Sequence, residues 1–169
     1  MKSIFLLVIT LIGLVTHGYG QQNTIWSKWK WLIGEWKGEG SGQPGKGEGK
    51  FTFNLSLGEK ILVRKSHSEY PAVKDKPKIS HEDLMIVYLD FTGNTSRAIY
   101  FDNEGHVINY TISNTDSSIT LVSDKIANVP VFRLSYSLLN NKTINVKFEI
   151  SQDGEKFINY LEGRSIKIK

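Results

Sequence analysis

Three histidines after residue 20 are the side chains best suited to acid–base or metal chemistry: His67, His81 and His106. No two of them have the i, i+4 spacing of a helical metal motif or the i, i+2 spacing that places ligands on one strand face. His106 shares a strand face with Ile108 and Tyr110. An imidazole against apolar surface takes its charge state from its neighbours, so His106 is either a ligand contact or a rim histidine bonded to the preceding turn.

Carboxylates and hydroxyls form no catalytic constellation in this sequence. No Gly-x-Ser-x-Gly segment is present to expose a nucleophile. Glu82 and Asp83 are adjacent, and neighbouring residues of a strand point to opposite faces, which argues against a shared acid–base role. The run 102–104, Asp-Asn-Glu, lacks the further oxygen ligands of a calcium site and is typical of a turn. The sequence therefore predicts no catalytic residue and no metal site.

A glycine-rich stretch raises the question of nucleotide binding. Six glycines fall between Gly38 and Gly49, and residues 40–45 satisfy the G-x-G-x-x-G string. A dinucleotide site needs a helix after this string, because the pyrophosphate sits at a helix N-terminus. Residues 51–57 alternate apolar and polar side chains and predict a strand instead. The pattern favours glycines that let a first strand bend and turn.

Aromatic and aliphatic residues recur on one face of the predicted strands, accompanied by a few polar side chains. Small-ligand pockets are mostly apolar with a handful of placed polar groups. The candidate ligand-binding residues are Arg64, Tyr88, Tyr100, His106, Tyr110, Arg133, Tyr136 and Phe148. We interpret the chain as a binding protein for a small, largely apolar ligand whose polar end pairs with Arg64 or Arg133. The alternative is that aromatic side chains fill the interior, since barrels of about eight to ten strands lie between filled and hollow.

The elements that must position these residues follow from the spacing of apolar positions. Residues 24–33 repeat apolar side chains every three or four positions and predict one short N-terminal helix. From Gly34 onward the period is two, with short turns rich in Gly, Asn and Asp, which predicts about ten strands. No crossover helices separate them, so they pair antiparallel. We therefore predict an all-β fold, a closed antiparallel up-and-down β-barrel, with a two-sheet sandwich as the alternative.

Length and the N-terminus predict the domain organisation. Of 169 residues, 1–20 have the basic start, apolar run and small residues of a signal peptide, so we expect cleavage near Gly20 and one secreted or periplasmic domain over residues 21–169. The apolar run is too short for a transmembrane helix, so no stable membrane insertion is expected. The absence of cysteine excludes disulfides and a lipid-modified N-terminal cysteine. A formal charge of +4, spread along the chain, does not predict nucleic-acid binding.

The segment 31–40, Trp-Leu-Ile-Gly-Glu-Trp-Lys-Gly-Glu-Gly, places a Gly-x-Trp motif between the predicted helix and the first strand. It resembles the calycin superfamily, which includes lipocalins and fatty-acid-binding proteins, and is most similar to nitrobindin-like and related secreted barrels. The resemblance implies a lipocalin-like barrel in which Trp36 sits at the closed end, covered by Arg164 of the last strand. Nitrobindins hold haem through a histidine near the C-terminus, which residues 157–169 lack.

Two alternatives to the apolar-ligand binding protein stay open. A haem-binding, nitrobindin-like redox protein would need another axial ligand, for which Tyr160 is the candidate, so no cofactor is predicted. A filled barrel acting as an envelope protein would hold no ligand. The partner that the sequence favours is a small hydrophobic molecule.

Overall fold

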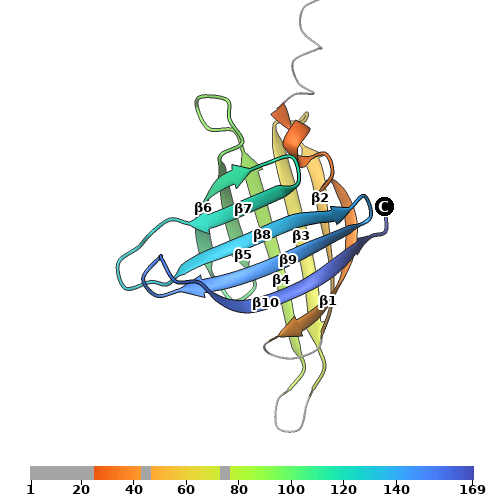
Figure 1. Cartoon of the computed structure of the whole chain (residues 1–169), viewed down its shortest axis with the longest axis vertical. Coiled ribbons are helices and arrows are strands. Elements are labelled where there is room, and N and C mark those ends of the chain that lie inside the picture. The colour runs from red at the N-terminus through yellow and green to blue at the C-terminus, as the bar shows by residue number, and fades with distance from the viewer. Residues whose placement is uncertain (1–24, 43–46, 73–76) are drawn as a thin grey trace, which may run out of the picture.

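The computed structural model describes residues 25–42, 47–72 and 77–169. The predicted signal peptide lies outside these residues. The described chain forms ten strands that pair antiparallel with their sequence neighbours and close into one barrel (Figure 1). The elements are the 3-10 turn η1 (Ser27–Trp29) and the strands β1 (Gly34–Gly42), β2 (Gly47–Ser56), β3 (Ile61–Tyr70), β4 (Ile79–Tyr88), β5 (Arg97–Asp102), β6 (Val107–Asn114), β7 (Ser118–Ser123), β8 (Val131–Asn140), β9 (Thr143–Ser151) and β10 (Ile158–Lys167). The predicted all-β closed barrel is confirmed, and the two-sheet sandwich is not.

Alternation of side chains along each strand separates the inside of the barrel from the outside. In β6, Tyr110 and Ile112 are buried, whereas Asn109 and Thr111 are exposed. The same period of two appears in β7, where every second residue is buried. Successive side chains of a strand point to opposite faces, so the inward set forms the core and the outward set meets water.

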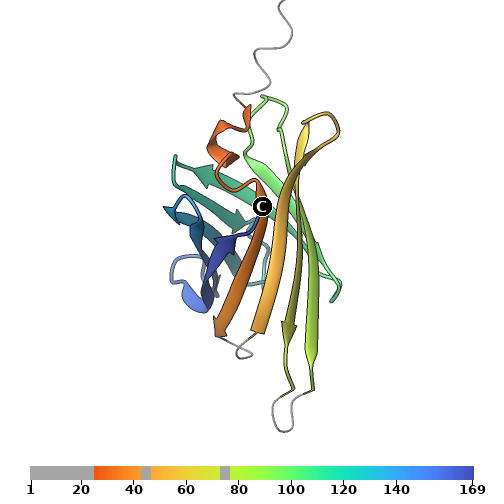
Figure 2. The ribbon, with the colours of Figure 1, turned by 90° about the vertical axis from the view of Figure 1, so that its right-hand side faces the viewer.

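The barrel closes where the first and last strands meet. β1 pairs with β2 on one side and with β10 on the other. The backbone N–H of Glu35 donates to the carbonyl oxygen of Lys169 at 3.0 Å, and its carbonyl oxygen accepts from the N–H of Ile168 at 2.8 Å. The C-terminus therefore lies beside β1 (Figure 2). Closure leaves no free sheet edge among the ten strands.

The predicted N-terminal helix is reduced to the single 3-10 turn η1 at one end of the barrel (Figure 1). A segment this short gains little from helix propagation, so its conformation is set by tertiary packing. The indole N–H of Trp26 donates to the carbonyl oxygen of Glu59 at 2.8 Å, and that of Trp29 to Thr95 Oγ1 at 3.2 Å. The spacing of apolar residues thus identified side chains that pack at the end of the barrel. The helix predicted from the same spacing is not formed beyond this single turn.

Buried hydrophobic side chains fill the end of the barrel that η1 covers. The largest fully buried side chains include Trp29, Trp36, Phe53, Leu62, Ile119, Tyr136 and Ile144. Phe53 packs edge-on against Tyr136 with ring centroids 5.4 Å apart. In the described part of the chain, no helix has the length and apolar character needed to cross a membrane. The end of the barrel away from η1 is where the interior stays open.

Candidate ligand-binding cavity

A cavity of about 580 Å³ occupies the half of the barrel opposite η1. Tyr70, at the end of β3, and Ile79, at the start of β4, line its mouth. These residues belong to the long hairpin that extends away from η1 in Figure 1. The volume lies within the range of small-ligand pockets, roughly 300 to 1,000 Å³. The lumen is therefore hollow at this end and packed at the other.

One wall of the cavity is apolar and comes from β8, β9 and β10. Its lining side chains are Phe132, Leu134, Val146, Phe148, Ile150 and Leu161. The rings of Phe132 and Phe148 stack with centroids 5.9 Å apart, and Tyr160 meets Phe148 edge-on at 6.0 Å. This wall offers an aromatic surface against which a hydrophobic chain or ring can pack.

Small residues on β1, β2 and β10 keep the space open. Gly38 and Gly49 line the cavity, opposite Ser165 and Ser68 respectively. A Cβ atom on Gly49 would lie 2.7 Å from Ser68 Oγ, and one on Gly38 would lie 2.8 Å from Ser165 Oγ. The glycine-rich stretch thus belongs to two paired strands, and at these two positions it leaves room in the lumen. Residues 43–46 of the G-x-G-x-x-G string lie outside the described residues.

The opposite wall, from β3 to β6, is polar, and its deepest charged group is Arg64. Its guanidinium Nη1 donates to Asp83 Oδ1, and both side chains are almost fully buried, at 10% and 6% exposure. The guanidinium also lies over the ring of Phe51, 5.3 Å from its centroid. Burial lowers the pKa of Arg64, but the charge of Asp83 and the nearby tyrosines outweigh it, so the pKa is raised overall. Arg64 is a fully charged, ion-paired group inside the barrel.

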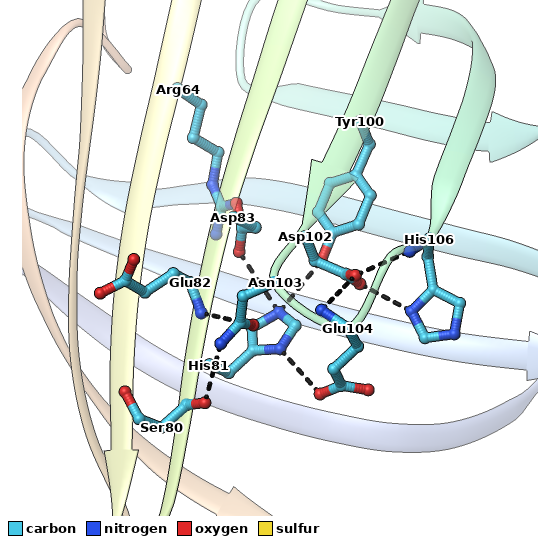
Figure 3. Close-up of polar contacts among 10 residues, drawn as sticks. All are labelled: Arg64, Ser80, His81, Glu82, Asp83, Tyr100, Asp102, Asn103, Glu104 and His106. Atoms are coloured by element: carbon cyan, nitrogen blue, oxygen red, sulfur yellow. Dashed lines mark hydrogen bonds and ion pairs between the residues drawn. The ribbon is translucent and has the colours of Figure 1, made fainter.

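His81 links two groups of this wall closer to the mouth (Figure 3). Its Nδ1 lies 3.2 Å from Glu104 Oε1, and its Nε2 lies 3.0 Å from the hydroxyl of Tyr100. One tautomer satisfies both contacts, with Nδ1–H donating to Glu104 and Nε2 accepting from Tyr100. Burial, together with the charges of Asp83 and Asp102, raises the pKa of Tyr100, so its hydroxyl keeps its proton. Tyr100 therefore presents a neutral hydroxyl to the cavity.

Asp102 organises the turn between β5 and β6. Its Oδ1 accepts the backbone N–H groups of Glu104 and His106 at 3.0 and 2.9 Å, and its Oδ2 lies 2.8 Å from His106 Nδ1. Burial raises the pKa of Asp102, yet these hydrogen bonds outweigh it and leave the pKa below its ordinary value. Among the described residues, no group of three His, Cys, Asp or Glu side chains is arranged to hold a metal ion. The turn predicted at 102–104 is present and carries an ionised carboxylate.

Five of the eight predicted ligand-binding residues line the cavity: Arg64, Tyr100, His106, Tyr110 and Phe148. Tyr136 lies one layer deeper, fully buried against Phe51 and Phe53, and burial raises its pKa to about 12. Tyr88 and Arg133 are not among the lining residues. Tyr88 hydrogen-bonds Arg97, its partner on β5, and Arg133 Nε donates to Glu149 at 2.6 Å.

Sequence reasoning did not select His81, Asp83 or Asp102 as site residues. A signal was present for Asp83, because adjacent residues of a strand face opposite sides and one of Glu82 and Asp83 had to point inward.

Trp36 was predicted to sit at the closed end of the barrel under Arg164. It is fully buried, and its indole N–H donates to the carbonyl oxygen of Leu32 at 2.8 Å. The cation over its ring is Lys167, 5.3 Å from the centroid, whereas Arg164 is exposed and borders the cavity.

Comparisons with known proteins bear on the fold alone. No family model matches the chain, and no curated protein sequence does. Among solved structures, Rv2717c from M. tuberculosis is similar with a TM-score of 0.57 and 14% sequence identity, over 88% of this chain and 98% of that one. The S-type phycobiliprotein lyase CPES from Guillardia theta is similar with a TM-score of 0.50 and 8% identity, over 83% and 90%. Together with the closed ten-stranded barrel, these similarities fit the lipocalin-like barrel fold that the sequence predicted, and they show no family.

Proposed function

We propose that this protein is a secreted, lipocalin-like binding protein that holds a small, largely apolar ligand in the barrel lumen. The observation that carries the proposal is a cavity of about 580 Å³ with one aromatic wall and one polar wall. Apolar walls supply most of the binding free energy of small ligands, and a few placed polar groups orient them. The filled barrel without a ligand is disfavoured by the same cavity.

The two walls divide the work of binding. Phe132 and Phe148 offer a stacked aromatic surface for the hydrophobic part of the ligand. Tyr100 and His81 lie on the facing wall, beside the Arg64–Asp83 ion pair, and would orient its polar part. Arg133 is not a partner for the polar end of the ligand, because it is paired with Glu149 and does not line the cavity.

Secretion is part of the proposal and rests on the first 20 residues of the sequence. The basic start, the apolar run and the small residues before Gln21 are typical of a signal peptide. We expect mature protein recovered from the periplasm or the culture medium to begin at or near Gln21. Mass determination of the intact secreted chain measures this directly, and a full-length mass would contradict it.

Native mass spectrometry of protein purified gently from its own host tests the binding function. We expect an adduct of small-molecule mass, together with thermal stabilisation by members of a lipid and aromatic panel. Val146→Phe fills the cavity from its apolar wall and should abolish both effects. Val107→Phe, at an exposed position outside the cavity, is the matched control. A wild-type protein that carries nothing and responds to no compound in the panel would overturn the proposal.

Haem is a second candidate ligand, and one contact favours it. The carboxylate of Asp102 lies 2.8 Å from His106 Nδ1 at the cavity mouth. A carboxylate in this place orients the other imidazole nitrogen towards a metal in many metalloproteins. The residues thus fit an axial histidine, and Tyr160 also borders the cavity. Titration with hemin should give a Soret band that His106→Ala removes and His67→Ala keeps; absence of the band ends this candidate.

A further inference from the structure

Among the described residues, the charged side chains that line the cavity include more carboxylates than guanidiniums. They comprise four carboxylates, two guanidiniums and two imidazoles: Glu48, Asp83, Asp102, Glu104, Arg64, Arg164, His81 and His106. Glu48 lies 3.6 Å from Lys37 Nζ, so it has a counter-charge outside the lining. Arg164 is exposed on β10, away from the polar wall. On that wall, one guanidinium and two imidazoles lie among three carboxylates, and the guanidinium is the one group there that carries a positive charge regardless of pH.

Arg64 is not free to receive an anion. Its Nη1 donates to Asp83, and its Nε, which lacks a hydrogen-bond partner among the described residues, is covered by protein atoms. A ligand carboxylate that took Arg64 would leave the carboxylate of Asp83 buried without a counter-charge, which is unfavourable. In the part of the chain that the structure describes, Arg64 is the buried guanidinium of the cavity lining, and Asp83 already neutralises its charge.

The carboxylate excess is concentrated where β4 and β5 meet. Asp83 and Asp102 are direct cross-strand partners, both line the cavity, and their side chains are 6% and 5% exposed. Like charges directly opposite on neighbouring strands destabilise a sheet. Arg64 relieves the repulsion at Asp83, and the backbone N–H groups of Glu104 and His106 stabilise the carboxylate of Asp102. Glu104 adds a third carboxylate at the rim, 3.2 Å from His81.

The side chains of His81, Asp83 and Tyr100 point towards one another (Figure 3). Hydrogen-bond acceptor atoms remain available between them. His81 Nε2 lies 3.7 Å from Asp83 Oδ2, which is longer than a hydrogen bond. The Tyr100 hydroxyl is 3.0 Å from that same Nε2 and keeps acceptor capacity of its own. An ammonium group has three N–H donors, one positive charge and no acceptor, so it complements this arrangement.

We propose that the ligand is an apolar amine, bound as its ammonium ion, with the charged end at the carboxylates of β4 and β5 and the hydrocarbon part along β8 to β10. This inference rests on the proposed binding function and specifies the chemical class of the ligand. The aromatic rings of Phe132, Phe148 and Tyr160 on the facing wall supply the apolar surface against which the hydrocarbon part packs.

Calorimetric titration of the wild-type protein with 1-octylamine, 1-octanol and octanoate at neutral pH tests the inference. The three probes share one chain and differ in head-group charge. We expect octylamine to bind at least about tenfold more tightly than octanoate, with octanol between them. Octanoate binding as tightly as octylamine would overturn the amine inference and leave the binding function standing. If none of the three binds, the amine inference falls, whereas the binding function is overturned only if the native protein also carries nothing and responds to no compound in the panel.

Two variants locate the head group. Asp83→Asn should weaken octylamine binding about tenfold and strengthen octanoate binding, because it frees Arg64 to pair with an anion. Since loss of Asp83 leaves Arg64 without its partner and can unfold the barrel, Glu104→Gln at the exposed rim is the second variant and should weaken octylamine binding alone. Glu82→Gln changes the carboxylate beside Asp83 on the outer face, and we expect it to alter neither affinity. Unchanged octylamine affinity in both cavity variants would refute the assignment.

Discussion

Replacement of Arg64 by methionine tests whether the polar wall is buried as the structure describes it. Arg64 and Asp83 form an ion pair inside the barrel with side chains 10% and 6% exposed. Removing one partner of a buried pair costs about 3 to 5 kcal/mol, because the other charge stays buried without compensation. Here Asp102 lies directly opposite Asp83, so two carboxylates would face each other without a guanidinium. We therefore expect the upper part of that range.

A second substitution separates the lost charge from lost packing. In Arg64→Met with Asp83→Leu, both charges are gone and similar volume remains, so we expect a free energy of unfolding within about 1 kcal/mol of the wild type. The matched control is Arg97→Met, because Arg97 pairs with Asp124 on the outer surface, where the side chains are 31% and 41% exposed. Exposed pairs contribute roughly 0 to 1 kcal/mol, so this control should change little.

Urea unfolding followed by tryptophan fluorescence measures all three variants, since Trp26, Trp29 and Trp36 are buried at the end covered by η1. Midpoints are compared at constant slope, so that a change in compactness is not mistaken for a change in stability. A loss below about 1 kcal/mol for Arg64→Met, equal to that of Arg97→Met, would refute the reasoning: the pair would then be solvated and the cavity open to water at its floor.

Three further outcomes are expected. Hydrogen bonds from Arg133 and Lys147 outweigh burial and lower the pKa of Glu149 to about 2. The ionised Glu149 should therefore add about 2 to 3 kcal/mol to the free energy of unfolding, measured in urea against Glu149→Gln. This contribution is complete above pH 4.5 and should shrink as the pH falls towards 2. Gly49→Val should abolish ligand binding by calorimetry without unfolding the barrel, because the Ser68 hydroxyl can rotate away. Trp29→Ala should cost about 3 to 5 kcal/mol in thermal unfolding, since this side chain is fully buried.

The fold could be predicted from the sequence because each strand has its own alternation of apolar and polar residues. The period of two and the short polar turns are local features, and antiparallel pairing of sequence neighbours follows from short connections. The N-terminal segment differs, since the spacing of Trp26, Trp29 and Leu32 is also satisfied by a single turn whose indoles are anchored to distant loops. Those anchors depend on Glu59 and Thr95, which no local pattern links to the tryptophans.

The candidate site could be predicted only in part. Whether a residue faces the lumen depends on whether its position along the strand is odd or even, counted from a residue known to face inward. Phe132 lines the cavity, and Arg133, the next residue of β8, points to the opposite face of the strand. Likewise Met85 and Val87 of β4 are fully buried, which places Tyr88 on the other face. Counting from a secure inward residue on each strand would have excluded both.

To predict contacts between neighbouring strands, the pairing register has to be known as well as the inward-facing positions. His81 meets Glu104 from 23 positions earlier in the chain, and Asp83 meets Asp102 because the β4–β5 register pairs these two residues. A shift of one residue in that register would turn one carboxylate outward. The composition of the polar wall was visible in the sequence, but the pairing that concentrates charge there was not.

Closure of the barrel is what turns these two walls into one site. In the cyclic strand order, β3 to β5 lie across the lumen from β8 to β10. Inward positions of the first group include Arg64, Asp83 and Tyr100, and those of the second are mainly hydrophobic. If the β1–β10 seam opened, the aromatic wall would meet water and the carboxylates would lose the facing surface. A ligand that spans both walls should therefore stabilise the seam, and binding should slow amide hydrogen exchange at Glu35 and Ile168, where the chain ends are joined.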